Sequence, residues 1–312
     1  MGMKAELAEE ISQKFINQLE QGVVPWKKPW SPTAGCQLQN YQTKRAYRGI
    51  NILLLGLAGM EKGYTSPAWT TYKGALKSLG WDGQGGNAGA SAWRAANPGK
   101  GVRKDETATR IVYWGKIDKI DKTTGEDTSF FMCKMYNVFN TDQIDGIEWV
   151  TPDLGEPISV PAALSSIYEN YPNAPTLTHS EQDQAFYRPS TDAISLPLIG
   201  QFATVEGYAE TLCHELTHST GHPSRLKRFE INDKACKSDY AKEELVAEIG
   251  ASMMMQAAGI SVDMPAMADY IKGWLSALKD DHSLIVSAAQ AAQKAMDHIM
   301  APVAEMQEEE AA

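Results

Sequence analysis

The sequence predicts an α+β protein made of two domains, and three observations support this prediction. Apolar residues recur at helical spacing in segments near both ends of the chain, whereas two β-rich segments lie near its middle. Hydrophobic residues make up 43% of the 312 residues, which is enough for a buried core, and the length allows two domains. Charge divides the chain too: residues 1–150 carry 19 Lys and Arg against 15 Asp and Glu, and residues 151–312 carry 10 against 24.

Composition also predicts where the domains meet. The stretch 150–161 has the composition of a linker, with Pro152, Gly155, Pro157 and Pro161. We therefore expect a first domain over residues 1–149, a linker over 150–161 and a second domain over 162–300. Residues 301–312 form an acidic tail that we expect to be disordered.

In the first domain we expect helices and one hairpin. Residues 4–21 carry an apolar side chain at every fourth position, which predicts an amphipathic helix, and a short apolar helix is expected over 52–58. Two β-rich segments, 107–117 and 129–139, flank a turn-like stretch and therefore predict a hairpin. The glycine-rich residues 82–105 match no phosphate-loop pattern, and we expect them to form a mobile surface loop.

One segment of the second domain indicates a specific chemistry, because residues 213–222 read CHELTHSTGH and contain the pattern HExxH. Apolar residues at helical spacing precede it, so the motif is expected inside a helix. There His214 and His218 share one face, being four residues apart, and both imidazoles can reach one metal ion. Glu215 is then expected beside a metal-bound water, where it acts as the general base.

Such a centre needs a third protein ligand. Residues 240–253 predict a second helix, on which Glu244 and Glu248 lie four residues apart on an otherwise apolar segment, where a buried acid needs a partner. We favour Glu244 as the ligand and Glu248 as the group that orients a ligating histidine. His222 is the alternative ligand, although Gly221 and Pro223 indicate that the helix has ended there. Zinc is the expected metal, and manganese or cobalt would also suit this ligand set.

The elements around the motif predict the layout of a zincin, the class of metallopeptidase that HExxH typifies. Strands are expected at 175–177 and within 185–197, before the HExxH helix, and the edge of such a sheet can hold an extended peptide. Packing helices are expected at 162–170, 264–279 and 283–300.

The first domain has a different character, since residues 23–116 carry 14 basic against 4 acidic side chains and six of the eight tryptophans. Aromatic faces for base stacking and basic groups for phosphates are what binding of single-stranded DNA without strong sequence preference requires. No sequence-reading motif for nucleic acid is visible. The candidate contacts are Trp26, Lys27, Lys28, Trp30, Tyr41, Lys44, Arg45, Tyr47, Arg48, Trp69, Tyr72, Lys73 and Trp81.

Two further classes are disfavoured by the sequence. The four cysteines show no paired spacing, which argues against a disulfide framework and favours the reducing cytoplasm. The longest apolar run, residues 50–60, is too short to span a bilayer, so no membrane association is expected.

Taken in order, these segments resemble the ArdC family of plasmid and phage antirestriction proteins over nearly the whole chain. The resemblance rests on YRGIN (47–51), WTTY (69–72), IVYW (111–114), VFN (138–140), HELTHSTGHPSRL (214–226), EELVAE (243–248) and YIKGWL (270–275). It implies an N-terminal domain that binds single-stranded DNA, a C-terminal zincin-like metallopeptidase domain, and protection of DNA that enters a bacterium by conjugation.

Three hypotheses remain open at this stage. In the first, the protein binds single-stranded DNA and also hydrolyses a protein associated with that DNA. In the second, it is a module that coats single-stranded DNA, and its metal site is structural or vestigial. In the third, which we rank last, the acidic second half mimics DNA and binds a restriction enzyme.

Overall fold

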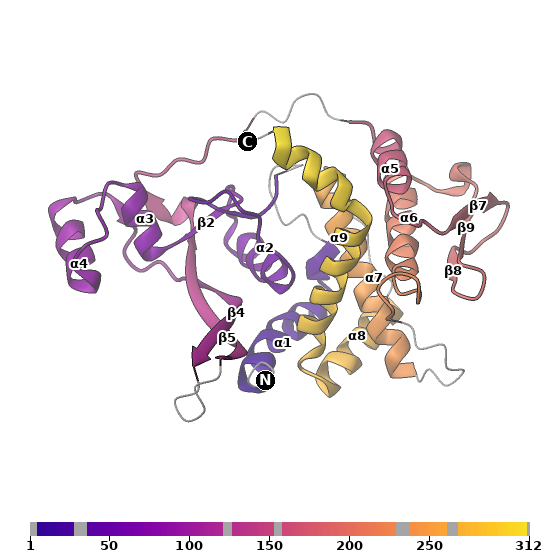
Figure 1. Cartoon of the computed structure of the whole chain (residues 1–312), viewed down its shortest axis with the longest axis horizontal. Helices are drawn as coiled ribbons and strands as arrows, with labels where there is room; N and C mark the ends of the chain where they lie inside the picture. Colours follow the sequence, from indigo (N-terminus) through magenta and orange to yellow (C-terminus); the bar gives the residue numbers. More distant parts are fainter. Residues whose placement is uncertain are drawn as a thin grey trace. The chain divides into compact units, whose positions relative to one another are not determined.

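A computed structural model of the protein describes residues 5–27, 36–120, 127–152, 158–228, 237–260 and 268–310 (Figure 1). Contacts divide the chain into two units. The first unit consists mainly of Gln37–Pro152, and the second unit consists mainly of Glu9–Pro29 and Asp153–Ala312. Both units combine helices with a sheet, so the expected α+β class is confirmed.

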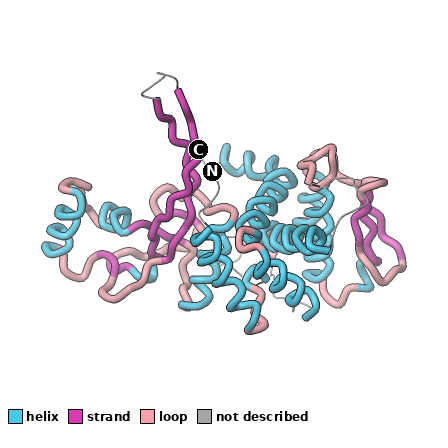
Figure 2. The backbone as a smooth tube through the Cα atoms, turned by 90° about the horizontal axis from the view of Figure 1, so that it is seen from below, coloured by secondary structure: helices cyan, strands magenta, loops and turns pink. Residues whose placement is uncertain are grey.

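The first unit is built on a four-stranded sheet of order β1-β2-β5-β4. Its strands are β1 (Gln39–Asn40), β2 (Ala68–Thr71), β4 (Thr109–Ile120) and β5 (Asp127–Asn140). The expected hairpin is confirmed, because β4 and β5 pair antiparallel from Thr109↔Val138 to Ile120↔Asp127 and run side by side as a long ribbon (Figure 2). The other elements are α2 (Ile50–Lys62), α3 (Tyr72–Ser78), β3 (Gly101–Val102), η2 (Thr141–Gln143) and β6 (Ile144–Asp145).

The glycine-rich stretch contains a helix, so the expectation of a mobile loop over all of residues 82–105 is wrong. Residues Gly86–Ala96 form α4, because five alanines favour helix and Ala90 is buried. Gly89 is needed for the close approach of the chain, since a Cβ atom there would lie 2.0 Å from the carbonyl oxygen of Gln84. The guanidinium of Arg94 donates to the carbonyl oxygens of Lys100 and Val102 and thereby holds the chain that follows α4.

The second unit places helices around the helix that carries HExxH. Strands β7 (Thr176–Ser180), β8 (Phe186–Arg188) and β9 (Ala193–Pro197) form a sheet of order β7-β9-β8, in which β7 and β9 are parallel. The core joins this sheet to α6 (Val205–Ser219) and α7 (Lys237–Ala257) through buried residues such as Ile194, Leu196, Leu212 and Met254. The remaining elements are α5 (Val160–Glu169), η3 (Ile199–Gln201), α8 (Ala268–Asp280) and α9 (Leu284–Glu310).

Most of the N-terminal helix belongs to the second unit, which includes Glu9–Pro29, whereas its first turn belongs to the first unit. Helix α1 (Ala5–Glu20) buries the apolar stripe that predicted it, including Ile11 and Phe15. Ser12 Oγ donates to the carbonyl oxygen of Leu278 on α8, and the turn η1 (Pro25–Lys27) follows α1. Contacts made far along the chain therefore decide where residues 9–29 belong.

The C-terminal helix is longer than expected. Helix α9 continues to Glu310, so most of the stretch expected as a disordered tail is helical. Within the described ranges, no helix is both long and apolar enough to cross a membrane.

Candidate metal centre and nucleic-acid interface

The centre of the second unit is formed by two adjacent helices, α6 and α7. Helix α6 begins at a cap in which the side chain of Thr204 accepts a hydrogen bond from the backbone N–H of Gly207. The HExxH motif occupies its last turns, where the expected helix is confirmed. Helix α7 approaches α6 closely because residue 250 is glycine: a Cβ atom there would lie 2.6 Å from Cγ2 of Thr217.

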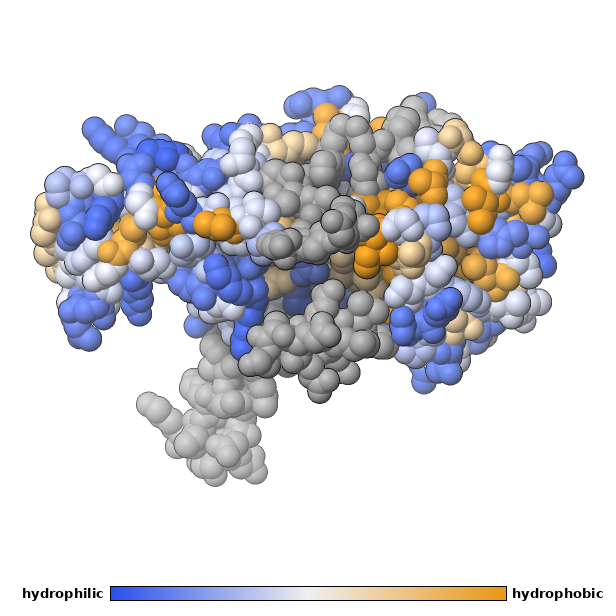
Figure 3. Space-filling view, turned by 90° about the horizontal axis from the view of Figure 1, so that it is seen from above, coloured by the Kyte–Doolittle hydropathy of each residue, from blue (hydrophilic) through white to orange (hydrophobic). Residues whose placement is uncertain are grey.

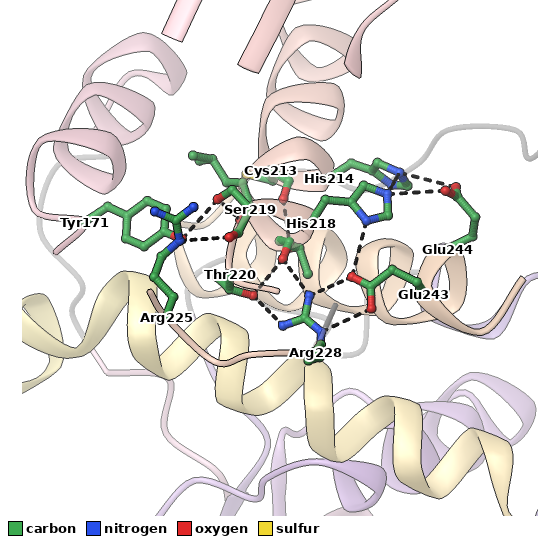
Figure 4. A network of polar contacts seen from close by, with 12 residues as sticks. Tyr171, Cys213, His214, His218, Ser219, Thr220, Arg225, Arg228, Glu243 and Glu244 are labelled. Atoms are coloured by element: carbon green, nitrogen blue, oxygen red, sulfur yellow. Dashed lines mark hydrogen bonds and ion pairs between the residues drawn. The ribbon is translucent and has the colours of Figure 1, made fainter. Parts of the chain in front are cut away.

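The structure brings His214, His218 and Glu244 together as one group (Figure 4). The two Nε2 atoms lie 3.0 Å apart, and the Glu244 carboxylate oxygens lie 3.5 Å from Nε2 of His214 and 3.3 Å from Nε2 of His218. Ligands bound tetrahedrally at about 2.1 Å from zinc are about 3.4 Å from one another. The three side chains therefore fit a metal ion of this size, and their donors are those that zinc and manganese accept.

Glu215 lies beside this group in a buried position, with 7% of its surface exposed. Burial raises the pKa of its carboxyl group, while His214 and His218 act in the opposite direction. A backbone hydrogen bond from Tyr187 of the edge strand β8 also opposes the rise. A carboxyl group with a raised pKa between a metal-binding group and a strand edge is suited to accept and return a proton.

The Nδ1 atom of each histidine in the group lies near a glutamate of α7. Nδ1 of His214 is 3.6 Å from Oε1 of Glu248, and Nδ1 of His218 is 3.3 Å from Oε1 of Glu243. Such carboxylates fix the ring orientation and the tautomer of a metal-bound histidine. The expected role of Glu248 agrees with this geometry, whereas the sequence reasoning missed Glu243.

Arg228 holds Glu243 in place through a forked contact (Figure 4). Its Nη2 atom lies 2.7 Å from Oε1 of Glu243 and 2.9 Å from the carbonyl oxygen of Thr217, and its Nη1 atom donates to Thr220 Oγ1. Arg228 thereby joins the end of α6 to α7 behind His218. The only sequence signal for this role was an arginine shortly after the motif, which by itself predicts nothing.

The electrostatics of the group follow from this crowding of carboxylates. Burial is the largest influence on His218 and lowers its pKa, but hydrogen bonds and charges from Glu243 and Glu244 outweigh it and raise the pKa to about 10. For Glu244, burial again comes first and raises the pKa, but the two histidines hold it well below the ordinary value. For Glu243, His218 and Arg228 likewise outweigh burial and lower the pKa.

His222 lies outside this group. Its Nδ1 atom is 2.7 Å from Oγ of Ser224, and the backbone N–H of Ser224 donates to it. The group of ligand atoms that lie within 4.8 Å of one another consists of His214, His218 and Glu244, among the residues that the structure describes. The turn after α6 carries His222 away, as the neighbouring Gly221 and Pro223 had indicated.

A second ion pair, between Arg225 and Asp192, anchors the chain that follows the motif. The side chain of Arg225 is fully buried, forms an ion pair with Asp192 and donates to the carbonyl oxygens of Asn173 and Ser219. Tyr187 of β8 donates to the same aspartate at 2.8 Å. This network connects the end of the HExxH helix to the sheet and so keeps β8 beside Glu215.

Several candidate DNA contacts are buried. Trp26 and Trp69 have no exposed surface and Trp81 only 6%, so in this structure none of these rings offers a free face to a base, contrary to expectation. At these positions the tryptophan ring packs against apolar residues of the core and is not available to stack on a base. Lys27 is also enclosed, by Glu210 and Glu248. Lys28 and Trp30 lie outside the described residues.

Other candidates remain on the surface of the first unit. Lys44, Arg45, Arg48, Tyr72 and Lys73 are exposed, Tyr41 and Tyr47 are partly buried, and Lys44 lies 4.5 Å from the centre of the Tyr41 ring. Hydrophilic residues cover most of the face over α3 and α4 that Figure 3 shows. Two further tyrosines of the first unit, Tyr113 and Tyr136 on the hairpin, are 54% and 44% exposed with ring centroids 5.8 Å apart.

Comparisons with known proteins agree with this architecture. Residues 172–291 match the family described as zincin-like metallopeptidase, and residues 5–139 match the N-terminal domain of anti-restriction factor ArdC. The second unit is thus a zincin-like metallopeptidase domain. Both its fold and the group of His214, His218 and Glu244 on α6 and α7 agree with this class. The whole chain belongs to the ArdC family of antirestriction proteins.

Solved structures and curated relatives support this assignment. The metal-free crystal structure of the ArdC antirestriction protein from plasmid R388 is 37% identical, with a TM-score of 0.75 over 96% of this chain and 98% of that one. The Mn(II)-bound structure of that protein gives 35% identity and a TM-score of 0.74. The chain is also 34% identical to DNA primase TraC of Escherichia coli, but spans only 27% of its length. An uncharacterized protein of Sinorhizobium fredii is 28% identical over 95% of its length.

Proposed function

We propose that this antirestriction protein binds single-stranded DNA that enters a bacterium by conjugation, and that it carries a zinc-dependent peptidase site. The observation on which the peptidase proposal rests is the close group of His214, His218 and Glu244, with the buried Glu215 beside it. The plasmid origin of the R388 relative supports the setting, and the Mn(II)-bound structure of that relative supports metal binding by the group.

In the proposed hydrolysis of a peptide, the metal-binding group, Glu215 and the edge of β8 each have a separate role. A bound divalent ion would supply Lewis acidity at the group and make a water molecule easier to deprotonate. Glu215, with its pKa raised by burial, takes the proton from the attacking water and delivers it to the departing amine nitrogen. The outer edge of β8 offers main-chain groups to an extended peptide next to that carboxyl.

The first unit supplies the proposed DNA-binding surface. Exposed tyrosines of the hairpin give faces on which bases can stack, and the exposed Lys44, Arg45 and Lys73 provide charge for phosphates. Contacts of this kind recognise the backbone and the flat faces of bases, so we expect little sequence preference. A protein bound to the same DNA is the proposed class of peptidase substrate.

Replacing Glu215 by Gln tests the peptidase proposal directly. The E215Q variant is expected to bind metal and single-stranded DNA as the wild type does, and to lose cleavage of a denatured single-stranded-DNA-binding protein used as substrate. E206Q, the same change in the first turn of the same helix, serves as the control and is expected to cleave normally. Cleavage by E215Q at the wild-type rate would disprove the role of Glu215.

The same variant decides between the two main hypotheses in cells. If E215Q still protects incoming DNA as well as the wild type, protection does not require hydrolysis and the protein acts as a coating module. If protection falls together with cleavage, hydrolysis is part of the function.

A further inference from the structure

Lys27 is held at the edge of the metal centre by two glutamates. Its Nζ atom lies 2.6 Å from Oε1 of Glu210 and 3.1 Å from Oε2 of Glu248, and only 11% of its side chain is exposed. Glu210 lies on α6 one turn before His214, and Glu248 lies on α7 one turn after Glu244. The lysine therefore links the two helices that carry every ligand of the group.

The position of Lys27 is determined by the packing of its neighbour. Trp26 is fully buried and meets Trp274 edge to face, with ring centroids 5.2 Å apart and an angle of 72° between the planes. The preceding Val24 and Pro25 are buried as well. The buried Trp26 ring and the main-chain hydrogen bond from Lys27 N to the carbonyl oxygen of Val24 anchor the turn, and from it the lysine stem extends to the two carboxylates.

Glu248 connects Lys27 to His214. One of its oxygens contacts Lys27, and the other lies 3.6 Å from Nδ1 of His214. The order cation, carboxylate, histidine repeats at the second ligand, where Arg228 holds Glu243 and Glu243 lies 3.3 Å from Nδ1 of His218. Lys27 thus has for His214 the place that Arg228 has for His218, although it comes from a distant part of the sequence.

We propose that Lys27 is a positioning residue of the metal centre, which holds Glu248 so that Glu248 fixes the ring and tautomer of His214. The N-terminal segment, although matched to the N-terminal ArdC domain, then completes the metal-binding site. The proposal rests on the metal-binding part of the proposed function and requires no peptidase activity. Loss of such an outer contact lowers metal affinity by about 10- to 100-fold in comparable centres.

The test compares K27M with K279M in the full-length protein. Lys279 forms an equally short ion pair, 2.6 Å from Oε1 of Glu20, but both of its partners are about half exposed and lie away from the ligands. Titration with Zn²⁺ against a chelator is expected to show about a 10- to 100-fold loss of affinity for K27M and none for K279M. The absorption spectrum of the Co²⁺-loaded protein should change for K27M alone, because the orientation of His214 relaxes.

A double-mutant cycle separates positioning from a general loss of stability. If Lys27 acts through Glu248, K27M and E248Q together should reduce Zn²⁺ affinity by less than the product of their separate effects. K27M with E210Q removes one of the carboxylates that K27M leaves unpaired, and so provides a variant that should fold even if K27M does not.

A folded K27M/E210Q protein with wild-type Zn²⁺ affinity and an unchanged Co²⁺ spectrum would overturn the proposal. The measurement is independent of hydrolysis: absence of peptide cleavage by the wild type would refute the proposed peptidase but leave the affinity result intact.

Discussion

Glu243 and Glu248 lie five positions apart on α7, and each faces the Nδ1 atom of a different histidine, at 3.3 Å for His218 and 3.6 Å for His214. At 3.6 residues per turn, Glu243, Glu244 and Glu248 cover about 140° of the helix surface. That spread lets one helix place Glu244 in the candidate metal group and also place a carboxylate beside each of the two histidines. Helix α7 therefore organises the centre as much as the motif itself does.

The first prediction concerns Glu243. In E243Q, the amide cannot hold the proton on Nδ1 of His218 as a carboxylate does, and Arg228 loses the charge that it pairs with. We expect Zn²⁺ affinity to fall about 10- to 100-fold, measured by competition with a chelator. E169Q, which alters an exposed glutamate on α5, is the control and should match the wild type. Equal affinities for E243Q and E169Q would contradict the role of Glu243.

The second prediction concerns protons released on metal binding. Although burial lowers it, the pKa of His218 is raised to about 10 by Glu243 and Glu244, so the metal-free site is protonated at neutral pH. A ligating histidine must lose that proton. We expect release of about one proton per metal ion at pH 8, and metal affinity that increases with pH up to about 10. Calorimetric titrations in two buffers of different ionisation enthalpy measure the release, and a heat independent of the buffer would contradict it.

The third prediction concerns the pH dependence of stability in the metal-free protein, which the same side chains determine. A raised pKa of His218 stabilises the fold below the ordinary value of 6.5, and this contribution is lost as the pH rises through about 10. The lowered pKa values of Glu243 and Glu244 stabilise the fold above the ordinary value of 4.5, and that contribution is lost on acidification. The cluster should therefore stabilise most between pH 4.5 and 6.5.

Thermal melting of the metal-free wild type and of H218N, from pH 6.5 to about 10, measures the contribution of His218. The difference in melting temperature between the two proteins should narrow steadily as the pH rises from 6.5 toward 10. A difference that stays constant over that interval would show that His218 does not keep its proton in the folded protein.

The fourth prediction concerns the contact between α6 and α7. In G250A the new methyl group would lie 2.6 Å from Cγ2 and 2.8 Å from Oγ1 of Thr217, and Thr217 is fully buried. We expect a loss of about 1–3 kcal/mol in the free energy of unfolding from this overpacking, measured by urea denaturation. G273A on α8 meets nothing within 4 Å and should instead gain up to about 1 kcal/mol from helix propensity.

A second substitution locates the cause of the G250A effect. Removing the Thr217 side chain atoms beyond Cβ in T217A/G250A should recover most of the stability that G250A loses, because the remaining Cβ of residue 217 lies 3.3 Å from the new methyl. No recovery would mean that the cost comes from another contact.

The fifth prediction concerns the hairpin tyrosines. Y113A and Y136A should each weaken binding of a single-stranded oligonucleotide by about 1–3 kcal/mol if bases stack on these rings. Y240A, which removes a tyrosine that is 64% exposed in the second unit, should bind normally. Affinity should also fall steeply with salt. Wild-type binding by Y113A/Y136A would exclude the hairpin as a stacking surface.

The residues that meet at the candidate metal centre were predictable because their pattern is local. His214, Glu215 and His218 fall within five residues of one helix, where the helical repeat alone determines which side chains share a face. Glu244 could be named because it pairs with Glu248 on an apolar helix, where an acid needs a partner. The hairpin of the first unit was predictable for a similar reason, since a turn joins strands that are adjacent in the sequence.

Only the tertiary structure shows which residues contact the side chains of the candidate metal centre and which tryptophans are buried. Lys27 meets Glu210 across 183 positions of sequence, and no local pattern distinguishes such a lysine from a solvated one. Composition placed Trp26 and Trp69 among DNA contacts, yet both are buried, because a large aromatic ring stabilises a core more often than it binds a base. Local repeats determine which side chains one helix presents, and only packing between distant segments determines what those side chains meet.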